Sequence, residues 1–275
     1  MRMPIALLCL VGFVAPLLAG DAALPFGEGM KEPKDICPGS VFNEPSSVLF
    51  HAERGTLFAV GDEGDLIELK TDGTVIKTAH PGHMDFEGIT LGPDGKIYVG
   101  VECLYDEKGK PSGILVVNPD TLEVERTIQV DPTLDGKRVF AVREDGGMEG
   151  LCYVPERGWF AVNQFFPAHV VELDVPAEGD RATVKRIVAD VSLKVICASD
   201  ISYDAASGHL LVISSSFEGR TGKVFELDID GKVLRELEVP GQAQEGLCVD
   251  ADGNAYVAQD SGGILRCEKP SGGGK

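Results

Sequence analysis

The sequence predicts an all-β protein, a five-bladed β-propeller built from four-stranded antiparallel blades. A Glu-Gly-Ile/Leu motif occurs at Glu87–Ile89, Glu149–Leu151 and Glu245–Leu247. Each copy opens a stretch that reads apolar strand, tight turn, apolar strand, and related stretches begin at Ser46 and Ser199. Successive starts lie roughly 40 to 60 residues apart, which is the period of propeller blades and not of helical repeats.

Each repeat is expected to contain the same strands in the same order. The first two strands form hairpins over residues 46–60, 87–100, 149–162, 199–213 and 245–258, with glycine in each turn. A third alternating strand follows as DLIELK, GILVVN, HVVELD, KVFELD or GILRCE. A fourth strand follows in the first four repeats as TVIKTA, EVERTIQV, TVKRIVA or KVLRELEV. The last repeat lacks a fourth strand, because only residues 269–275 remain, which we expect to form a flexible tail.

The missing strand is expected to come from the N-terminal side. The segment ICPGSVFN (36–43) has no partner in its own repeat, so we predict that it forms the outer strand of the last blade and closes the ring. In that position Cys37 would face Cys267. Six cysteines remain once Cys9 is removed with the leader, and six allow 15 pairings; we favour a Cys37–Cys267 disulfide.

The N-terminus has the pattern of a secretory signal over residues 1–23. Arg2 precedes the apolar run IALLCLVGFVAPLL, and small residues follow it. We therefore expect an exported protein, periplasmic or secreted, with an N-terminal extension over 24–35 and a propeller over 36–268. The apolar run is too short for a good membrane span, and we predict no span elsewhere.

Charge limits the class of partner. The formal net charge is −19, so nucleic acid and anionic lipid surfaces would be repelled. The same charge favours cations as ligands. We expect a monomer that binds a small molecule or a protein.

The repeated carboxylates predict a metal site. Strands that open the blades line the central channel of a propeller, so five equivalent positions should meet there: Ser46, Glu87, Glu149, Ser199 and Glu245. Three carboxylates on the order of 6 Å apart would repel by ~3 kcal/mol per pair at an effective dielectric constant of ~20. Retained protons, a basic side chain such as Arg143 or Lys194, or a bound cation would relieve that repulsion. Because the ligands are all oxygens, we predict Ca²⁺. Alternatively, each glutamate caps backbone amides of the next blade without metal.

Further polar residues are expected beside this ring. Glu102 and Asp260 end second strands of repeats that carry a ring glutamate, and Asp62 or Glu63, Gln164 and Ser215 occupy similar places. His83 and Asp85 belong to the cluster HPGHMDFEG together with His80, and Arg143 is a further neighbour. Three aromatic residues could form an apolar wall: Phe165, Phe166 and Phe217.

Motifs for other chemistry are missing. There is no G-x-S-x-G elbow, no H-E-x-x-H and no phosphate-binding Gly-Lys-Ser loop. Two Asp-Gly segments, 228–231 and 250–254, resemble the start of a calcium-binding EF-hand loop but lack its final glutamate. They predict hairpin turns, and nucleophilic catalysis is unsupported.

Three segments resemble the SdiA-regulated domain family, exported bacterial propellers distantly similar to NHL repeats. They are DFEGI (85–89), AQEGL (243–247) and DGNAYVAQD (252–260), and the likeness covers most of residues 40–268. The resemblance implies a five-bladed propeller that can carry calcium, and it implies no established reaction. The implied metal role falls on Glu87, Glu149 and Glu245, whereas Ser46 and Ser199 depart from the motif.

Gluconolactonase-like, paraoxonase-like and phytase-like esterase propellers are also similar, and they imply a rival function. In the first two, a channel calcium polarises a lactone carbonyl, although those folds generally have six blades. His83 or Asp260 would have to serve as general base. We therefore expect a calcium-binding module, with a metal-dependent hydrolase of lactones or esters and a metal-free scaffold as alternatives.

Overall fold

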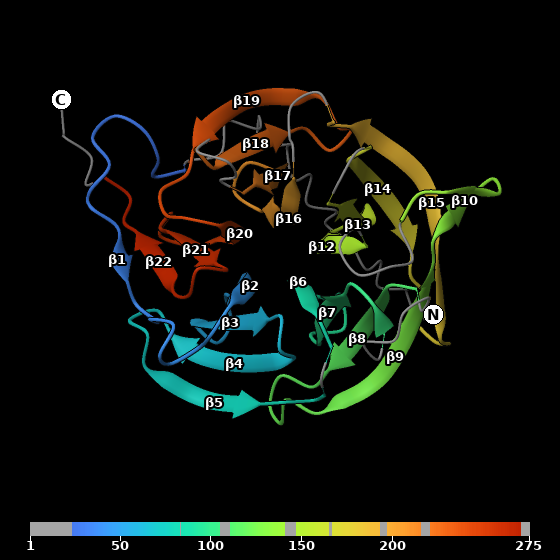
Figure 1. Ribbon diagram of the computed structural model, residues 1–275, viewed down its shortest axis with the longest axis horizontal. Coiled ribbons are helices and arrows are strands. Elements are labelled where there is room, and N and C mark those ends of the chain that lie inside the picture. The colour runs from blue at the N-terminus through green and yellow to red at the C-terminus, as the bar shows by residue number, and fades with distance from the viewer. Residues whose placement is uncertain are drawn as a thin grey trace, which may run out of the picture.

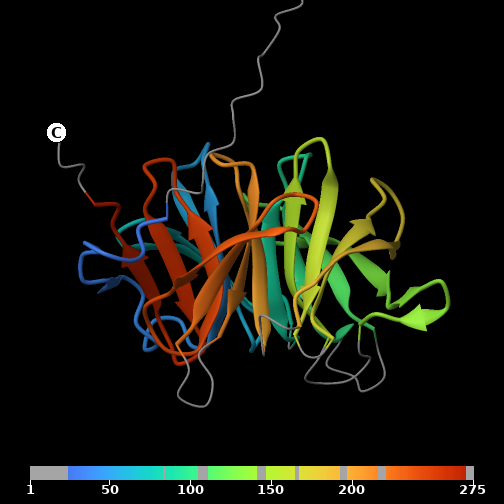
Figure 2. The same ribbon diagram turned by 90° about the horizontal axis from the view of Figure 1, so that it is seen from above.

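The computed structural model describes residues 24–82, 84–104, 111–140, 147–164, 167–192, 197–215 and 221–270. Every regular element in these residues is a β-strand, as the sequence predicted. The strands form a flattened ring whose turns lie on its two faces (Figures 1 and 2). Within the same residues, no helical segment has the length and hydropathy to span a lipid bilayer.

Two of the repeats form separate four-stranded antiparallel sheets, here called units 1 and 4. Unit 1 consists of β2 (Pro45–His51), β3 (Thr56–Gly61), β4 (Asp65–Lys70) and β5 (Val75–Ala79). Unit 4 consists of β16 (Ala198–Asp204), β17 (His209–Ser214), β18 (Lys223–Leu227) and β19 (Val233–Glu238). Each strand pairs with the next one in sequence, as expected for strands joined by short turns.

Two further repeats share one eight-stranded sheet. Unit 2 consists of β6 (Phe86–Leu91), β7 (Ile97–Val101), β8 (Gly113–Val117) and β9 (Val124–Asp131). Unit 3 consists of β12 (Met148–Val154), β13 (Gly158–Asn163), β14 (His169–Asp174) and β15 (Arg181–Asp190). The outer strands β9 and β15 pair in parallel over three residues, from Arg181 opposite Gln129 to Thr183 opposite Asp131. A small hairpin, β10 (Thr133–Leu134) and β11 (Lys137–Arg138), follows unit 2.

Unit 5 takes its outer strand from the other end of the chain. β20 (Gln244–Val249), β21 (Ala255–Gln259) and β22 (Ile264–Cys267) are completed by β1 (Lys34–Asp35). The predicted outer strand at 36–43 therefore began too late. Hydrogen bonds continue only through Ile36 and Cys37, both to Ile264, and the chain then turns where Val41 N donates to Pro38 O.

The favoured disulfide does not form, and Cys37 and Cys267 are both free thiols. Asp35 lies opposite Leu265 and Cys37 is hydrogen bonded to Ile264, so Cys37 lies about four strand positions from the place opposite Cys267. Four positions span ~13 Å along a strand, well beyond the ~7 Å limit on the Cα separation of a disulfide.

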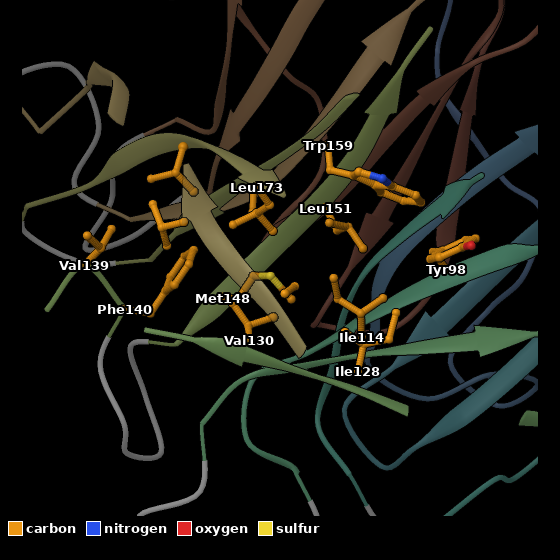
Figure 3. Close-up of a cluster of buried hydrophobic side chains, with 14 of the residues drawn as sticks. Tyr98, Ile114, Ile128, Val130, Val139, Phe140, Met148, Leu151, Trp159 and Leu173 are labelled. Carbon is orange, nitrogen blue, oxygen red and sulfur yellow. The ribbon is translucent and has the colours of Figure 1, made fainter. Parts of the chain in front are cut away.

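The hydrophobic core lies between neighbouring units. In the cluster of Figure 3, Ile114 and Ile128 of unit 2 pack with Leu151 and Trp159 of unit 3, all of them buried. The rings of Tyr98 and Trp159 have centroids 4.4 Å apart. Burying each large apolar side chain contributes ~1.5–3 kcal/mol. Because these contacts join different units, they hold the first strands β2, β6, β12, β16 and β20 around the centre (Figure 1).

Candidate metal centre

A β-bulge occurs at the same place in every first strand. The pairing of each first strand with its second strand skips one residue. A bulged residue leaves the ladder and its side chain is turned to a new direction. The skipped residues are Ser46, Glu87, Glu149, Ser199 and Glu245. The five positions that the sequence made equivalent are therefore equivalent in the structure.

The glycine that follows each glutamate is explained by the neighbouring first strand. A Cβ on Gly88 would lie 2.5 Å from Leu151 N, and one on Gly150 would lie 2.5 Å from Ile201 N. Contacts this short do not occur, so only glycine lets adjacent first strands approach so closely. In the Glu-Gly motif, the glutamate occupies the bulge and the glycine allows the units to pack.

Two units have a side chain where the others have glycine. Ser47 and Asp200 follow the bulged serines, and both are buried. Ser47 Oγ donates a hydrogen bond of 2.7 Å to Asp200 Oδ2, and Ile201 N donates one of 2.8 Å to Asp200 Oδ1. Sequence reasoning missed this pair, although the signal was present, because Asp200 stands in the glycine position of the motif.

An acidic cavity of about 240 Å³ opens where the bulges lie. Its lining consists of seven carboxyl side chains and one amide: Asp62, Asp85, Glu87, Glu102, Glu149, Gln164, Glu245 and Asp260. Three of these are bulge glutamates, Asp85 precedes β6, and the others follow second strands. None of the eight carries positive charge.

The two ring serines lie behind the acids. Ser46 Oγ donates to Asp62 Oδ1, and the Ser199 side chain is hydrogen bonded to Glu245. Both serines are buried, at 1% and 0% exposure. Neither serine is part of the cavity lining, but each is hydrogen bonded to a carboxyl group that is.

The predicted neighbours have different positions. Glu102 and Asp260 line the cavity, as does Asp85. Glu102 Oε1 accepts a 3.0 Å hydrogen bond from Gly147 N. His80 instead lies 3.0 Å from Asp65, away from the lining.

Several predicted residues lie outside the described part of the chain. They are His83, Arg143, Lys194, Phe165, Phe166 and Phe217, together with the leader 1–23.

Burial and mutual repulsion raise the pKa of five carboxyl groups that line the cavity. Burial is the larger cause, and it raises the pKa of Asp62 to about 6, of Asp85 to about 7 and of Glu245 to about 8. For Glu87 and Glu149, burial raises the pKa well above the ordinary range, and neighbouring carboxylates raise it further. Hydrogen bonds from Ser46 to Asp62 and from Ser199 to Glu245 act in the opposite direction. The cavity therefore disfavours a full set of negative charges unless a positive charge joins them.

The available oxygens fit a calcium ion. Asp62, Asp85 and Glu87 each offer an oxygen, and the three lie within 4.8 Å of one another. Ca²⁺ binds oxygens at ~2.3–2.6 Å, so two ligands of one ion lie at most ~5 Å apart. Three buried oxygens of this lining have no hydrogen-bond partner among the described residues: Asp85 Oδ1, Glu149 Oε1 and Gln164 Oε1. The described lining offers carboxylate and amide oxygens and no imidazole or thiolate, which suits a hard cation.

Solved structures with a similar fold include three proteins that carry enzyme names. A crystal structure of a protein provisionally named a gluconolactonase has a TM-score of 0.52 at 15% identity, covering 88% of this chain and 93% of that chain. A luciferin-regenerating enzyme has a TM-score of 0.53 at 12% identity, covering 86% and 95%. A glucose dehydrogenase has a TM-score of 0.50 at 12% identity, covering 86% and 99%. At these identities the likeness shows the fold alone, which is β-propeller-like.

Sequence comparison identifies the family. No curated protein sequence matches this chain. The SdiA-regulated family matches residues 37–261, which is most of the chain. This chain belongs to the SdiA-regulated family.

Proposed function

We propose that this chain is an exported five-bladed β-propeller that binds calcium in its central acidic cavity. The ion and its carboxylates would form the floor of a binding site for a small molecule or a protein. The observation that carries the proposal is the meeting of seven carboxyl groups from separate parts of the chain around about 240 Å³. Among the described residues, the lining contains no basic side chain.

The unpartnered oxygens support a metal rather than capping alone. Glu102 does cap a backbone amide, that of Gly147. Glu149 Oε1 has no such partner among the described residues, although the side chain is only 2% exposed. An unsatisfied buried carboxylate oxygen costs more than ~1 kcal/mol, and a cation would remove that cost. Asp85 and Gln164 each contribute another oxygen of this kind.

Calcium suits the site better than the alternatives. It takes 6–8 oxygens in flexible geometry, whereas Mg²⁺ demands near-ideal octahedral geometry at shorter distances. Zinc and copper prefer nitrogen or sulfur ligands, and the described residues of the lining include neither histidine nor cysteine.

The test is elemental analysis of the purified protein, followed by thermal melting with calcium and with chelator. We expect about one calcium per chain and a Tm several degrees higher with calcium, because an ion that binds only the folded chain stabilises it. Glu149→Gln should weaken the calcium response, whereas Asp252→Asn, on an exposed turn, should leave it unchanged. Equal Tm with calcium and with chelator in the wild type would refute the proposal.

A second candidate is a metal-dependent hydrolase of lactones or esters. The number of carboxyl groups favours this activity. Asp62, Asp85 and Glu87 together could hold the ion, so the cavity has more carboxyl groups than the ion needs. Glu149 and Asp260 would then be free to hold or accept a proton. Turnover of aryl esters or lactones that is lost in Glu149→Gln and kept in Asp252→Asn would support this activity. No turnover across such a panel, with calcium retained, would reject it.

A further inference from the structure

A second cavity lies at the opposite ends of the first strands. Its volume is about 510 Å³. Every unit contributes to its lining, which consists of Val48, Leu49, Phe50, Ile89, Thr90, Leu91, Gly92, Pro93, Cys152, Tyr153, Pro155, Ser202, Tyr203, Ala205, Cys248 and Val249. Residues near the start of the first strands, including the three bulge glutamates, line the acidic cavity. Residues near the ends of the first strands line the second cavity. We call it the apolar cavity.

Along β2 and along β16, the buried Ser47–Asp200 pair lies between the residues at the acidic cavity and the residues that line the second cavity. In β2, Ser46 is on the acidic side, Ser47 pairs with Asp200, and Val48 lines the apolar cavity. In β16 the same order holds, with Ser202 on the apolar side. The apolar cavity is therefore a separate site from the candidate metal centre.

The lining has no charge. None of its side chains is Asp, Glu, Lys, Arg or His, although 25% of the residues in this chain are charged. Burial raises the pKa of the Cys152 and Cys248 thiols well above their ordinary range, so they too stay neutral. An ion entering this cavity would lose water without finding a partner charge, which is costly.

Polar groups nevertheless reach the apolar cavity. Thr90 Oγ1 accepts a 3.1 Å hydrogen bond from Tyr153 N. Because Thr90 is the acceptor in this bond, its hydroxyl proton can still be donated to a ligand. Ser202 Oγ has no partner among the described residues. A mostly apolar cavity with a few polar groups is the usual form of a small-molecule site, and the volume falls in the usual ~300–1,000 Å³ range.

The surroundings favour a small molecule over a protein surface. The hairpin turns that follow the lining strands expose acidic residues, among them Glu53, Asp94, Glu156 and Asp252. The most exposed large apolar side chains of the described chain lie elsewhere, at Val41 and on outer strands such as β5 and β19. The same turns carry Arg54, Lys96 and Arg157, each of which is paired with a carboxylate outside these turns. The acidic residues of the turns therefore remain in excess around the cavity.

We propose that the apolar cavity binds one small, uncharged, largely apolar molecule that carries a hydroxyl or carbonyl group. Such a ligand would fill the space between the Phe50, Tyr153 and Tyr203 side chains and hydrogen bond to Thr90 or Ser202. The acidic turns around the mouth would disfavour anions. This site does not depend on the calcium proposal.

The test uses N-phenyl-1-naphthylamine, a neutral probe whose fluorescence rises in apolar surroundings. We expect saturable binding of one probe per chain, unchanged by chelator and unchanged in Glu149→Gln. The anionic probe 8-anilinonaphthalene-1-sulfonate should bind more weakly, because its sulfonate faces the acidic turns.

Matched variants locate the probe. Leu91→Asp places a charge in the lining and should weaken binding at least about tenfold. Leu234→Asp makes the same change on outer strand β19, where Leu234 is 39% exposed, and should leave binding unchanged. Ala205→Trp alters an exposed residue of the lining, so it should block the cavity without disturbing the core. No saturable binding, or equal affinity in the Leu91 and Leu234 variants with both folded, would overturn the proposal.

Discussion

Without calcium, the stability of this protein should fall as the pH rises from 5 to 8. Asp85 shows the size of the effect, since burial raises its pKa from its ordinary 3.8 to about 7. A carboxyl group with a raised pKa holds its proton longer in the folded state than in the unfolded state. The free energy of unfolding therefore decreases with pH between the unfolded and folded pKa values.

The magnitude follows from the width of that window. From pH 5 to pH 7, an interval of about two pH units, the raised pKa of Asp85 alone lowers the free energy of unfolding by roughly 3 kcal/mol. For a chain of this length ~1 kcal/mol shifts Tm by about 2–4 °C, so the expected loss is about 6–12 °C. Glu245, whose pKa rises to about 8, extends the loss toward pH 8. The carboxyls interact, so their separate contributions do not add.

The assay is thermal melting at pH 5, 6, 7 and 8, in chelator and in saturating calcium. Calcium should remove most of the loss, so the difference between the two Tm values should widen with pH. Asp85→Asn should raise the chelated Tm at pH 8 and abolish the calcium response, whereas Asp252→Asn should change neither. A chelated Tm that stays constant or rises from pH 5 to 8 would refute the reasoning.

Three further predictions concern the packing beneath the site. Gly150→Ala should cost about 1–3 kcal/mol in urea unfolding, because its Cβ would lie 2.5 Å from the backbone atom Ile201 N. It should cost more than Gly100→Ala, whose Cβ would first meet the flexible end of Met148 at 3.2 Å. Equal costs would contradict this. Ser47→Ala should lower the free energy of unfolding by about 1–3 kcal/mol, because it removes the 2.7 Å hydrogen bond to buried Asp200. Adding Asp200→Gly should recover part of that stability. No recovery in the double variant would argue against the pair. Peptide mapping of the non-reduced protein should find Cys37 and Cys267 unlinked, and a peptide joining them would disprove the register described for β1 and β22.

Sequence patterns were enough to identify the first strands and the equivalent position in each of them. Hydrophobic alternation located the hairpins, and the Glu-Gly motif marked the bulge in three of five first strands. The register extended that position to Ser46 and Ser199, which the bulges confirm. Repeats make this inference strong, because one local geometry is reused at each copy.

Contacts between units were harder to predict from the sequence. The ligand role expected of Ser46 and Ser199 stays a prediction. Their hydroxyls are hydrogen bonded to Asp62 and Glu245, and neither serine is part of the cavity lining. Asp62 was one of two options at its position, and the structure places its oxygen beside those of Asp85 and Glu87. The outer strand of unit 5 begins two residues earlier than predicted, at Lys34. Its register with β22 puts Cys37 about four positions from the place opposite Cys267.

The sequence by itself determined the strand pattern, the repeat and the recurrence of a carboxylate at one place in it, because these depend on residues close together along the chain. Only the tertiary structure decided which acids share one cavity, that Ser47 and Asp200 fill the centre, and that an uncharged cavity lies at the opposite ends of the same strands. Those features depend on contacts between side chains from distant segments of the chain. Local sequence patterns do not determine the register or the spacing of such segments.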